Sequence, residues 1–371
     1  MTILGTRPEI IRLSCIMGIL DKYVNHVIVH TGQNYDYELN EIFFKDLKVR
    51  KPDHFLKADC STLGKAYGNI IIAAEKVLTQ EQPDAVLILG DTNSSVAGII
   101  AKRMKIPIYH MEAGNRCFDF NVPEEINRRI IDHISDFNLV YTEHARRNLL
   151  AEGLPARRIY LTGSPMKEVL EAYSSEIQAS KALKNNKLMQ KRYFLVSLHR
   201  EENIDLPQHF RALLETLNLL AKTYHLPIIV STHPRTRKRL AKTKGFRRNA
   251  LIKFLKPFGF IDYANLQINA FCVISDSGTI SEEAAILSFP AVTPRNAMER
   301  PEALDSGHII LTGLDPETIL NAVKLVVAEN DKYKKHKIPS EYEINNASSR
   351  VVKLIIGTAK LSHLWDNIVI K

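Results

Sequence analysis

The feature that most constrains this chain is a short run of β-branched and other apolar residues that recurs along it. Each run ends at a polar or glycine-containing turn that leads into an amphipathic helical stretch. Such alternation is typical of βαβ units, whose strands are parallel and share one sheet. In the first half the runs are residues 2–4, 27–31, 85–89, 106–111, 139–142 and 159–162. This half therefore predicts a doubly wound, parallel α/β domain.

The same pattern begins a second time after a lysine-rich segment, residues 181–191, which lacks a strong apolar stripe and is interpreted as a connection. The second set of runs comprises residues 193–198, 228–232, 251–255, 271–275, 291–293 and 308–311. The length of 371 residues suits two domains, since domains average about 150 residues. We expect residues 1–175, completed by the tail 356–371, to form one Rossmann-like domain, and residues 176–355 to form the other.

The bulk composition is that of a soluble globular protein, with 45% hydrophobic and 25% charged residues. No apolar run approaches the roughly 20 residues that cross a bilayer, and no signal-peptide pattern is visible. The four cysteines, Cys15, Cys60, Cys117 and Cys272, include no CxxC pair, which disfavours a zinc site or a disulfide framework. We therefore expect a cytoplasmic protein without membrane insertion.

The net charge of +9 is compatible with nucleic acid, an anionic surface or phosphorylated small molecules as partners. The excess is scattered or clustered locally, as in residues 235–244 and 332–337, without the aromatic interleaving of single-strand binders. We interpret most of it as solvated surface, and the rest as steering for an anionic substrate. No nucleic-acid partner is predicted.

Motifs for common cofactors are missing from the sequence. No G-x-G-x-x-G follows a predicted strand, and no G-x-x-x-x-G-K-[ST] occurs. The H-x-x-x-H spacing of His26 and His30 spans the predicted strand 27–31, where residues four apart are about 13 Å apart and cannot share a metal ion, and no other spacing of metal ligands is seen. The sequence therefore predicts neither a dinucleotide cofactor, nor P-loop phosphoryl transfer, nor a catalytic metal.

Polar motifs instead follow the predicted strands at their carboxyl ends, where open parallel sheets bind ligands. Seven such turns are GTRPE at 5–9, GQ at 32–33, GDT at 90–92, EAG at 112–114, HREEN at 199–203, HPR at 233–235 and DSG at 276–278. Arg7 suits an anionic ligand, and the turn at Ser277 and Gly278 exposes backbone N–H groups that suit phosphate, with Glu283 able to accept ribose hydroxyls. The alternatives are a plain turn with a surface arginine and an ordinary helix cap.

Carboxylates and one histidine form a candidate acid/base set at these ends. Asp91 and Glu112 follow two strands, Glu124 and Glu125 come shortly after them, and His199 ends the first strand of the second half. Any one of them could be a helix cap or a solvated charge. Together they suit proton transfer, because carboxylates that are partly buried and repel one another have raised pKa values.

Read in order, these motifs resemble a known family. GTRPE, TGQ at 31–33, GDT, HMEAG at 110–114, PEEINR at 123–128, HREEN, HPR, SDSG at 275–278, EE at 282–283 and ERPEA at 299–303 are similar to the non-hydrolysing UDP-N-acetylglucosamine 2-epimerases. The resemblance spans nearly the whole chain. It implies the GT-B architecture, two Rossmann-like domains with the active site between them, in a homodimer that serves cell-surface polysaccharide biosynthesis.

The resemblance also implies roles for single residues. Asp91, Glu112, Glu124 and His199 stand at the family's catalytic positions. The UDP moiety would be held by Arg7, His233, Ser277, Gly278 and Glu283, with Phe258 near the uracil, and Arg300 and Glu302 would line the sugar side.

The implied chemistry explains the missing cofactor motifs. The C2 hydrogen of an N-acetylhexosamine is not next to a carbonyl carbon, so a carboxylate would remove it while UDP leaves C1, and re-addition would invert C2. The loop GNRCFD at 114–119 is similar to a branch that acts on 6-deoxy sugars to form UDP-N-acetyl-L-fucosamine, and Arg12 stands where most relatives carry lysine. A hydrolysing epimerase, a GT-B glycosyltransferase and a non-catalytic nucleotide-sugar sensor remain alternatives.

Overall fold

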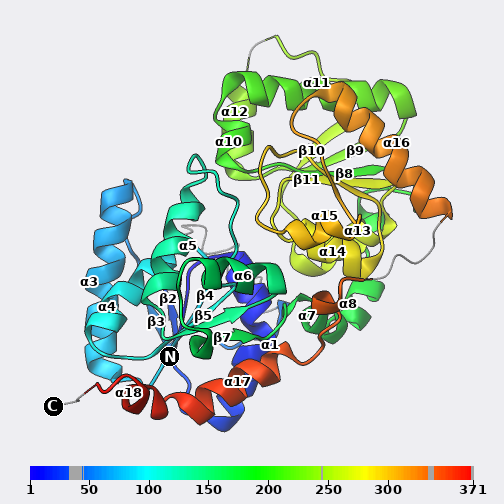
Figure 1. Cartoon of the computed structure of the whole chain (residues 1–371). Coiled ribbons are helices and arrows are strands. Elements are labelled where there is room, and N and C mark those ends of the chain that lie inside the picture. Colours follow the sequence, from blue (N-terminus) through cyan, green and yellow to red (C-terminus); the bar gives the residue numbers. More distant parts are fainter. Residues whose placement is uncertain (33–43, 45, 244, 333–337, 369–371) are drawn as a thin grey trace. The chain divides into compact units, whose positions relative to one another are not determined.

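The computed structural model describes residues 1–32, 44, 46–243, 245–332 and 338–368 (Figure 1). It contains two compact units. The first comprises Met1–Ala172 and Ile344–Lys371, and the second comprises Tyr173–Glu343. Each unit is built on one parallel sheet with helices, as the recurring apolar runs predicted.

The first sheet has the strand order β3-β2-β1-β4-β5-β6-β7, and every pair that the structure describes is parallel. Its strands are β1 (Thr2–Leu4), β2 (Ile28–His30), β3 (His54–Phe55), β4 (Val86–Leu89), β5 (Ile108–Met111), β6 (Phe137–Val140) and β7 (Ile159–Leu161). The order reverses between β1 and β4, which makes the carboxyl ends of these strands the topological switch point where ligands bind in such sheets.

The helices of the first unit are α1 (Arg7–Tyr23), α3 (Leu63–Glu81), α4 (Ala97–Arg103), α5 (Pro123–Ile134), α6 (Glu143–Ala151), α7 (Met166–Ala172), α17 (Ala347–Thr358) and α18 (Leu361–Trp365). Two 3₁₀ turns, η1 (Asn93–Val96) and η2 (Ala156–Arg158), complete it. Helix α1 packs against α7 and α17, whereas α3, α4 and α5 form a second group (Figure 1).

The second sheet has the order β10-β9-β8-β11-β12-β13 and is parallel in every described pair. Its strands are β8 (Phe194–Ser197), β9 (Ile228–Ser231), β10 (Ile252–Leu255), β11 (Cys272–Ser275), β12 (Ala291–Thr293) and β13 (Ile310–Leu311). The helical elements are α8 (Ser174–Ala179), α9 (Ala182–Asn185), α10 (Glu201–Ile204), α11 (Pro207–Tyr224), α12 (Pro234–Lys242), α13 (Phe260–Asn269), α14 (Ile280–Leu287), α15 (Pro301–Asp305), α16 (Pro316–Lys332) and η3 (Ser340–Tyr342).

Alternating side chains of this sheet enter two separate cores. Phe194 and Val196 of β8 join a cluster with α11 and α16, whereas Leu195, between them, joins a cluster with α13 and α14. Side chains two residues apart share a face of a strand, so a strand that is apolar at every position is buried on both faces. This is why the runs in the sequence are continuous rather than alternating.

The chain crosses between the units at positions that differ from the predicted boundaries, which lay between residues 175 and 176 and between residues 355 and 356. It leaves the first unit after Ala172 and returns at Ile344. The whole of α17 lies in the first unit because it packs along α1 and buries Val351 and Val352. The predicted connection 181–191 includes the short helix α9, whose Ala182 is buried in the second unit's core. The sequence did not indicate β3, an edge strand of two residues.

Candidate active site

Two of the predicted catalytic carboxylates lie at adjacent strand ends of the first unit. Asp91 follows β4, Glu112 follows β5 directly, and these strands pair along their length. Both turns need unusual backbone, with φ of +73° at Gly90 and +66° at Glu112. A Cβ on Gly90 would lie 3.0 Å from Glu112 Oε2, so glycine gives the carboxylate its place as well as the turn its conformation.

Each of these carboxylates is paired with an arginine from a different helix. Arg12 of α1 forms an ion pair with Glu112, and the two side chains are only 9% and 10% exposed. Arg128 of α5 donates to Asp91 Oδ2 from both Nε (2.9 Å) and Nη2 (2.6 Å). Such charge-assisted bonds offset the cost of removing carboxylates from water.

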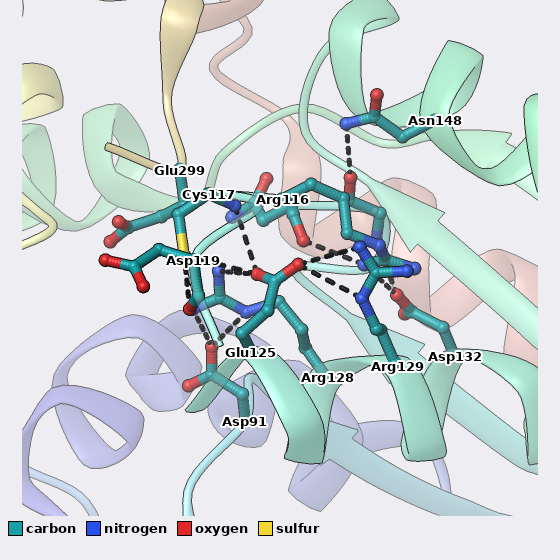
Figure 2. Close-up of polar contacts among 12 residues, drawn as sticks. Asp91, Arg116, Cys117, Asp119, Glu125, Arg128, Arg129, Asp132, Asn148 and Glu299 are labelled. Carbon is teal, nitrogen blue, oxygen red and sulfur yellow. Dashed lines mark hydrogen bonds and ion pairs between the residues drawn. The ribbon is translucent and has the colours of Figure 1, made fainter. Parts of the chain in front are cut away.

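The fully buried carboxylate of Glu125 organises the surrounding loop and helix (Figure 2). It accepts from Arg128 Nη1 at 3.1 Å, from Arg129 at 3.0 Å and from the backbone N–H of Cys117 at 3.0 Å. The Cys117 thiol also donates to it. Glu125 therefore connects the loop after β5 to the arginine that holds Asp91.

Glu124 stands one residue earlier, half-buried in the first turn of α5. Burial raises the pKa of the Tyr67 phenol, and the nearby charge of Glu124 adds to this rise. Tyr67 donates to Asn127, which in turn donates to the main-chain oxygen of Asp91 at 2.9 Å. The structure thus brings Glu124 into the same group of α5 contacts as Asp91.

The GTRPE turn is joined to the GDT turn through Glu9, a residue whose role the sequence analysis missed. Glu9 Oε2 accepts from the backbone N–H of Gly5 (2.6 Å) and Thr6 (2.7 Å), and Oε1 accepts from the Thr92 hydroxyl at 2.6 Å. Burial raises the pKa of Glu9 despite these bonds. Arg7 begins α1 beside this cap and is half-buried, and Gln33 of the TGQ turn lies outside the described residues.

In the second unit, the predicted site residues follow three neighbouring strands, β9, β8 and β11. The buried Asp276 accepts from the backbone N–H of His199 at 3.0 Å and pairs with His199 Nδ1 at 3.1 Å. Burial alone would raise the pKa of Asp276, but His199 and the hydrogen bonds lower it to about 2. The His199 and His233 rings lie 6.1 Å apart, and His233 caps α12.

A chain of hydrogen bonds follows β11 through the predicted phosphate turn. The hydroxyls of Ser277 and Thr279 are 3.0 Å apart, Thr279 donates to Glu283 at 2.9 Å, and Gln267 donates to the other Glu283 oxygen at 2.6 Å. Burial raises the pKa of Glu283. A Cβ on Gly278 would lie 2.7 Å from Glu299 Oε1, so a larger residue in this turn would displace the Glu299 carboxylate.

The remaining predicted contacts lie deeper. Arg300 is 2% exposed and forms an ion pair with Glu282, while Glu302 accepts from the Tyr342 hydroxyl at 2.5 Å. Burial raises the pKa of Glu302. Phe258 is half-buried against the cluster of α13 and α14. Arg300 is therefore enclosed by its unit in this structure.

Arg128 was not predicted as a site residue from the sequence, although its spacing from Glu125 gives a signal. Glu125 lies three residues before Arg128 and four before Arg129, the spacing at which side chains meet on a helix. Within the described residues no group of three or more His, Cys, Asp or Glu side chains could hold a metal ion. In the same part of the chain, no helix has the length and hydrophobicity needed to cross a membrane.

Comparison with known proteins agrees with this geometry. A family profile described as UDP-N-acetylglucosamine 2-epimerase matches residues 20–356. The chain is 48% identical to a solved UDP-N-acetylglucosamine 2-epimerase from Rickettsia bellii, with a TM-score of 0.91 over 98% of this chain and 97% of that one. It is 36% identical to the Methanocaldococcus jannaschii enzyme solved in complex with UDP-GlcNAc and UDP, with a TM-score of 0.89 over 96% and 99%.

A curated UDP-N-acetylglucosamine 2-epimerase from Methanococcus maripaludis is 37% identical over 370 residues, which covers 96% of this chain and 98% of the relative. The two parallel sheets with their helices are the GT-B type of these structural neighbours. The chain belongs to the UDP-N-acetylglucosamine 2-epimerase family.

Proposed function

We propose that this protein interconverts UDP-N-acetylglucosamine and UDP-N-acetylmannosamine by inverting C2. The bond to UDP breaks and re-forms within each turnover, so the product is again a UDP-sugar. The observation that carries the proposal is the pair of carboxylates, Asp91 and Glu112, at adjacent strand ends and each bound by an arginine. The relative solved with UDP-GlcNAc and UDP supports this substrate.

The proposed reaction is an elimination followed by its reverse on the other face. A carboxylate takes the C2 proton, the C1–O bond breaks with its electron pair leaving on UDP, and a C1=C2 double bond forms. UDP then adds back to C1 while a proton is delivered to the opposite face of C2. No net oxidation occurs, so the route requires no redox cofactor.

The proposed roles divide between the two units. Asp91, Glu112 and Glu124 serve proton transfer, and His199, oriented by Asp276, assists the leaving diphosphate. Ser277 and Gly278 bind phosphate through hydroxyl and backbone N–H groups, and Glu283 binds the ribose. Contacts of Arg7, His233, Phe258 and Arg300 with the UDP-sugar belong to the same proposal.

A cytoplasmic homodimer that supplies a cell-surface polysaccharide pathway completes the proposal. Four free thiols, Cys15, Cys60, Cys117 and Cys272, support a reducing compartment. Light scattering of the purified protein tests the dimer directly, since a monomer at working concentrations contradicts it.

The deciding experiment incubates the protein with UDP-GlcNAc in deuterium oxide and follows C2 by NMR. We expect deuterium at C2, appearance of the manno epimer and an intact UDP linkage. Release of free sugar would indicate a hydrolysing enzyme, and an unchanged substrate would contradict both. Asp91→Asn should reduce exchange by about a hundredfold or more and leave UDP binding intact. Asp84→Asn, at an exposed aspartate of the same unit, is the matched control.

A further inference from the structure

A surface hollow of about 670 Å³ lies in the second unit, away from every residue of the proposed site. It is formed by α11 and by the segment that joins α12 to β10. Its charged and polar lining comprises Arg211, Glu215, Asn218, Lys222, Thr243, Arg247, Arg248 and Asn249. This segment leads into the amino end of β10, whereas His199, His233 and Ser277 follow the carboxyl ends of the strands. The hollow and the predicted UDP turn thus lie toward opposite ends of the sheet.

Helix α11 presents one continuous face to the hollow. Arg211, Glu215, Asn218 and Lys222 are spaced by four, three and four residues, which places them in one row along the helix. Asn218 fixes the opposite wall, because its Nδ2 donates to the Arg247 carbonyl and its Oδ1 accepts from the Asn249 N–H, both at 3.0 Å. The two walls are therefore held together by direct hydrogen bonds.

The charge of this hollow is strongly one-sided. Four cationic side chains line it against the single carboxylate of Glu215, and all five are exposed. Residues 234–261 contain no aspartate or glutamate at all. In the described part of the chain, the guanidinium groups of Arg211, Arg247 and Arg248 and the ammonium group of Lys222 have neither an ion pair nor a hydrogen bond. Their charge is thus available to a ligand.

We propose that this hollow binds a small anion that carries at least two phosphate groups. Guanidinium groups match phosphate oxygens in bidentate geometry, and three of them with one lysine, set against Glu215, leave about three positive charges, more than the roughly two negative charges of a single phosphate. The volume is in the range of sites for ligands well above the size of one phosphate. Glu215 would repel a phosphate and accept a hydroxyl, which favours an organic diphosphate such as a nucleotide over an inorganic one.

Calorimetric titration with inorganic pyrophosphate at low salt tests the phosphate chemistry, and UDP is left out because its own diphosphate would compete for the hollow. We expect saturable binding that is tighter than that of orthophosphate and about tenfold or more weaker in Arg247→Gln/Arg248→Gln. The matched control is Arg237→Gln/Lys238→Gln, which removes the same charge from exposed positions of the same acid-free segment outside the hollow. The control should bind as the wild type does.

Absence of saturable binding, or equal losses in the two double variants, overturns the proposal. Tighter binding of a mixed-sequence oligonucleotide, weakened as much by the control as by the hollow variant, would assign the basic segment to nucleic acid instead. Failure of the protein to epimerise UDP-GlcNAc would count against the proposed function alone. The comparison between the two double variants would still decide what the hollow does.

Discussion

Asp91 accepts three hydrogen bonds from side chains of a single helix, two from Arg128 and one from Asn127. Arg128 grips its carboxylate through two nitrogens, Asn127 holds its main-chain oxygen, and Glu125 fixes Arg128 from the other side. A planar guanidinium that makes two bonds to one group restrains its direction as well as its distance. Arg128 is therefore a positioning residue in the proposed reaction, where misplacement of a reacting group by about 1 Å can cost a hundredfold in rate.

Arg128→Gln should lower kcat by about a hundredfold with little change in KM, since it disturbs a reacting group rather than the grip on UDP. Arg129→Gln is the matched control, because Arg129 is the next residue and binds the same Glu125 but contacts Phe118 and Phe120 rather than Asp91. Steady-state kinetics on both variants, with added guanidinium as a rescue for Arg128→Gln, checks this. Equal losses in the two variants would contradict the assigned role.

The ionised carboxylate of Asp276, which holds the His199 turn, makes the stability of the fold depend on pH. Its folded-state pKa of about 2 lies below the ordinary value of 3.8, so the ionised form stabilises the fold above that ordinary value. This contribution, about 2 kcal/mol, is lost as the pH falls through 3.8 toward 2.

The gap in unfolding free energy between wild type and Asp276→Asn should therefore shrink by about 2 kcal/mol between pH 5 and pH 2. Urea unfolding at stepped pH measures it. Asp205→Asn, at an exposed aspartate of the same unit, is the control and should show little change. A gap that stays constant for Asp276→Asn would show that the carboxylate is not stabilised in its charged form.

At the scale of single elements, helix α1 contains a glycine that lowers its stability and could be replaced. Gly18 is exposed in the helix interior, and a Cβ there would meet no atom within 4 Å. Glycine costs a helix interior about 1 kcal/mol relative to alanine through its backbone entropy. Gly18→Ala should stabilise the first unit by about that amount, visible as a higher midpoint in thermal unfolding.

Gly357 is the natural comparison, since it is also exposed and unobstructed but lies in the last turn of α17. Helix ends fray, so Gly357→Ala should gain clearly less. Alanine at Gly114 should instead be destabilising, because φ there is +81° and a Cβ would lie 2.3 Å from the Ala145 carbonyl oxygen. If Gly18→Ala proved destabilising, α1 would be constrained by a contact that its exposed face does not show.

At the scale of the whole molecule, the proposed division of labour predicts separate responses to two ligands. UDP alone should slow hydrogen exchange in the second unit at residues 275–283, where the phosphate turn begins α14. UDP-GlcNAc should add protection at residues 90–128 of the first unit. Ligands protect the segments they bind by mass action on local opening. Protection of residues 90–128 by UDP alone would contradict this division.

Much of the two-sheet fold could be predicted from the sequence. Strands buried on both faces must be apolar at nearly every position, so β8, β9 and β11 can be recognised as continuous apolar runs in the sequence. The prediction of two parallel α/β sheets is confirmed. The edge strand β3 has two residues and no such run. The crossing near residue 344 was misplaced because the apolar face of α17 fits a partner in either unit, and only packing along α1 decides between them.

The sequence by itself determined the polar residues that must stand at strand ends, because parallel strands carry their ligands there. The tertiary structure alone decided which side chains hold them. Arg12 reaches Glu112 across a hundred positions, and Arg128 reaches Asp91 from a helix that begins after the next strand. Pairs of buried charges depend on distance and angle between elements, and these are fixed by packing rather than by any local pattern of residues.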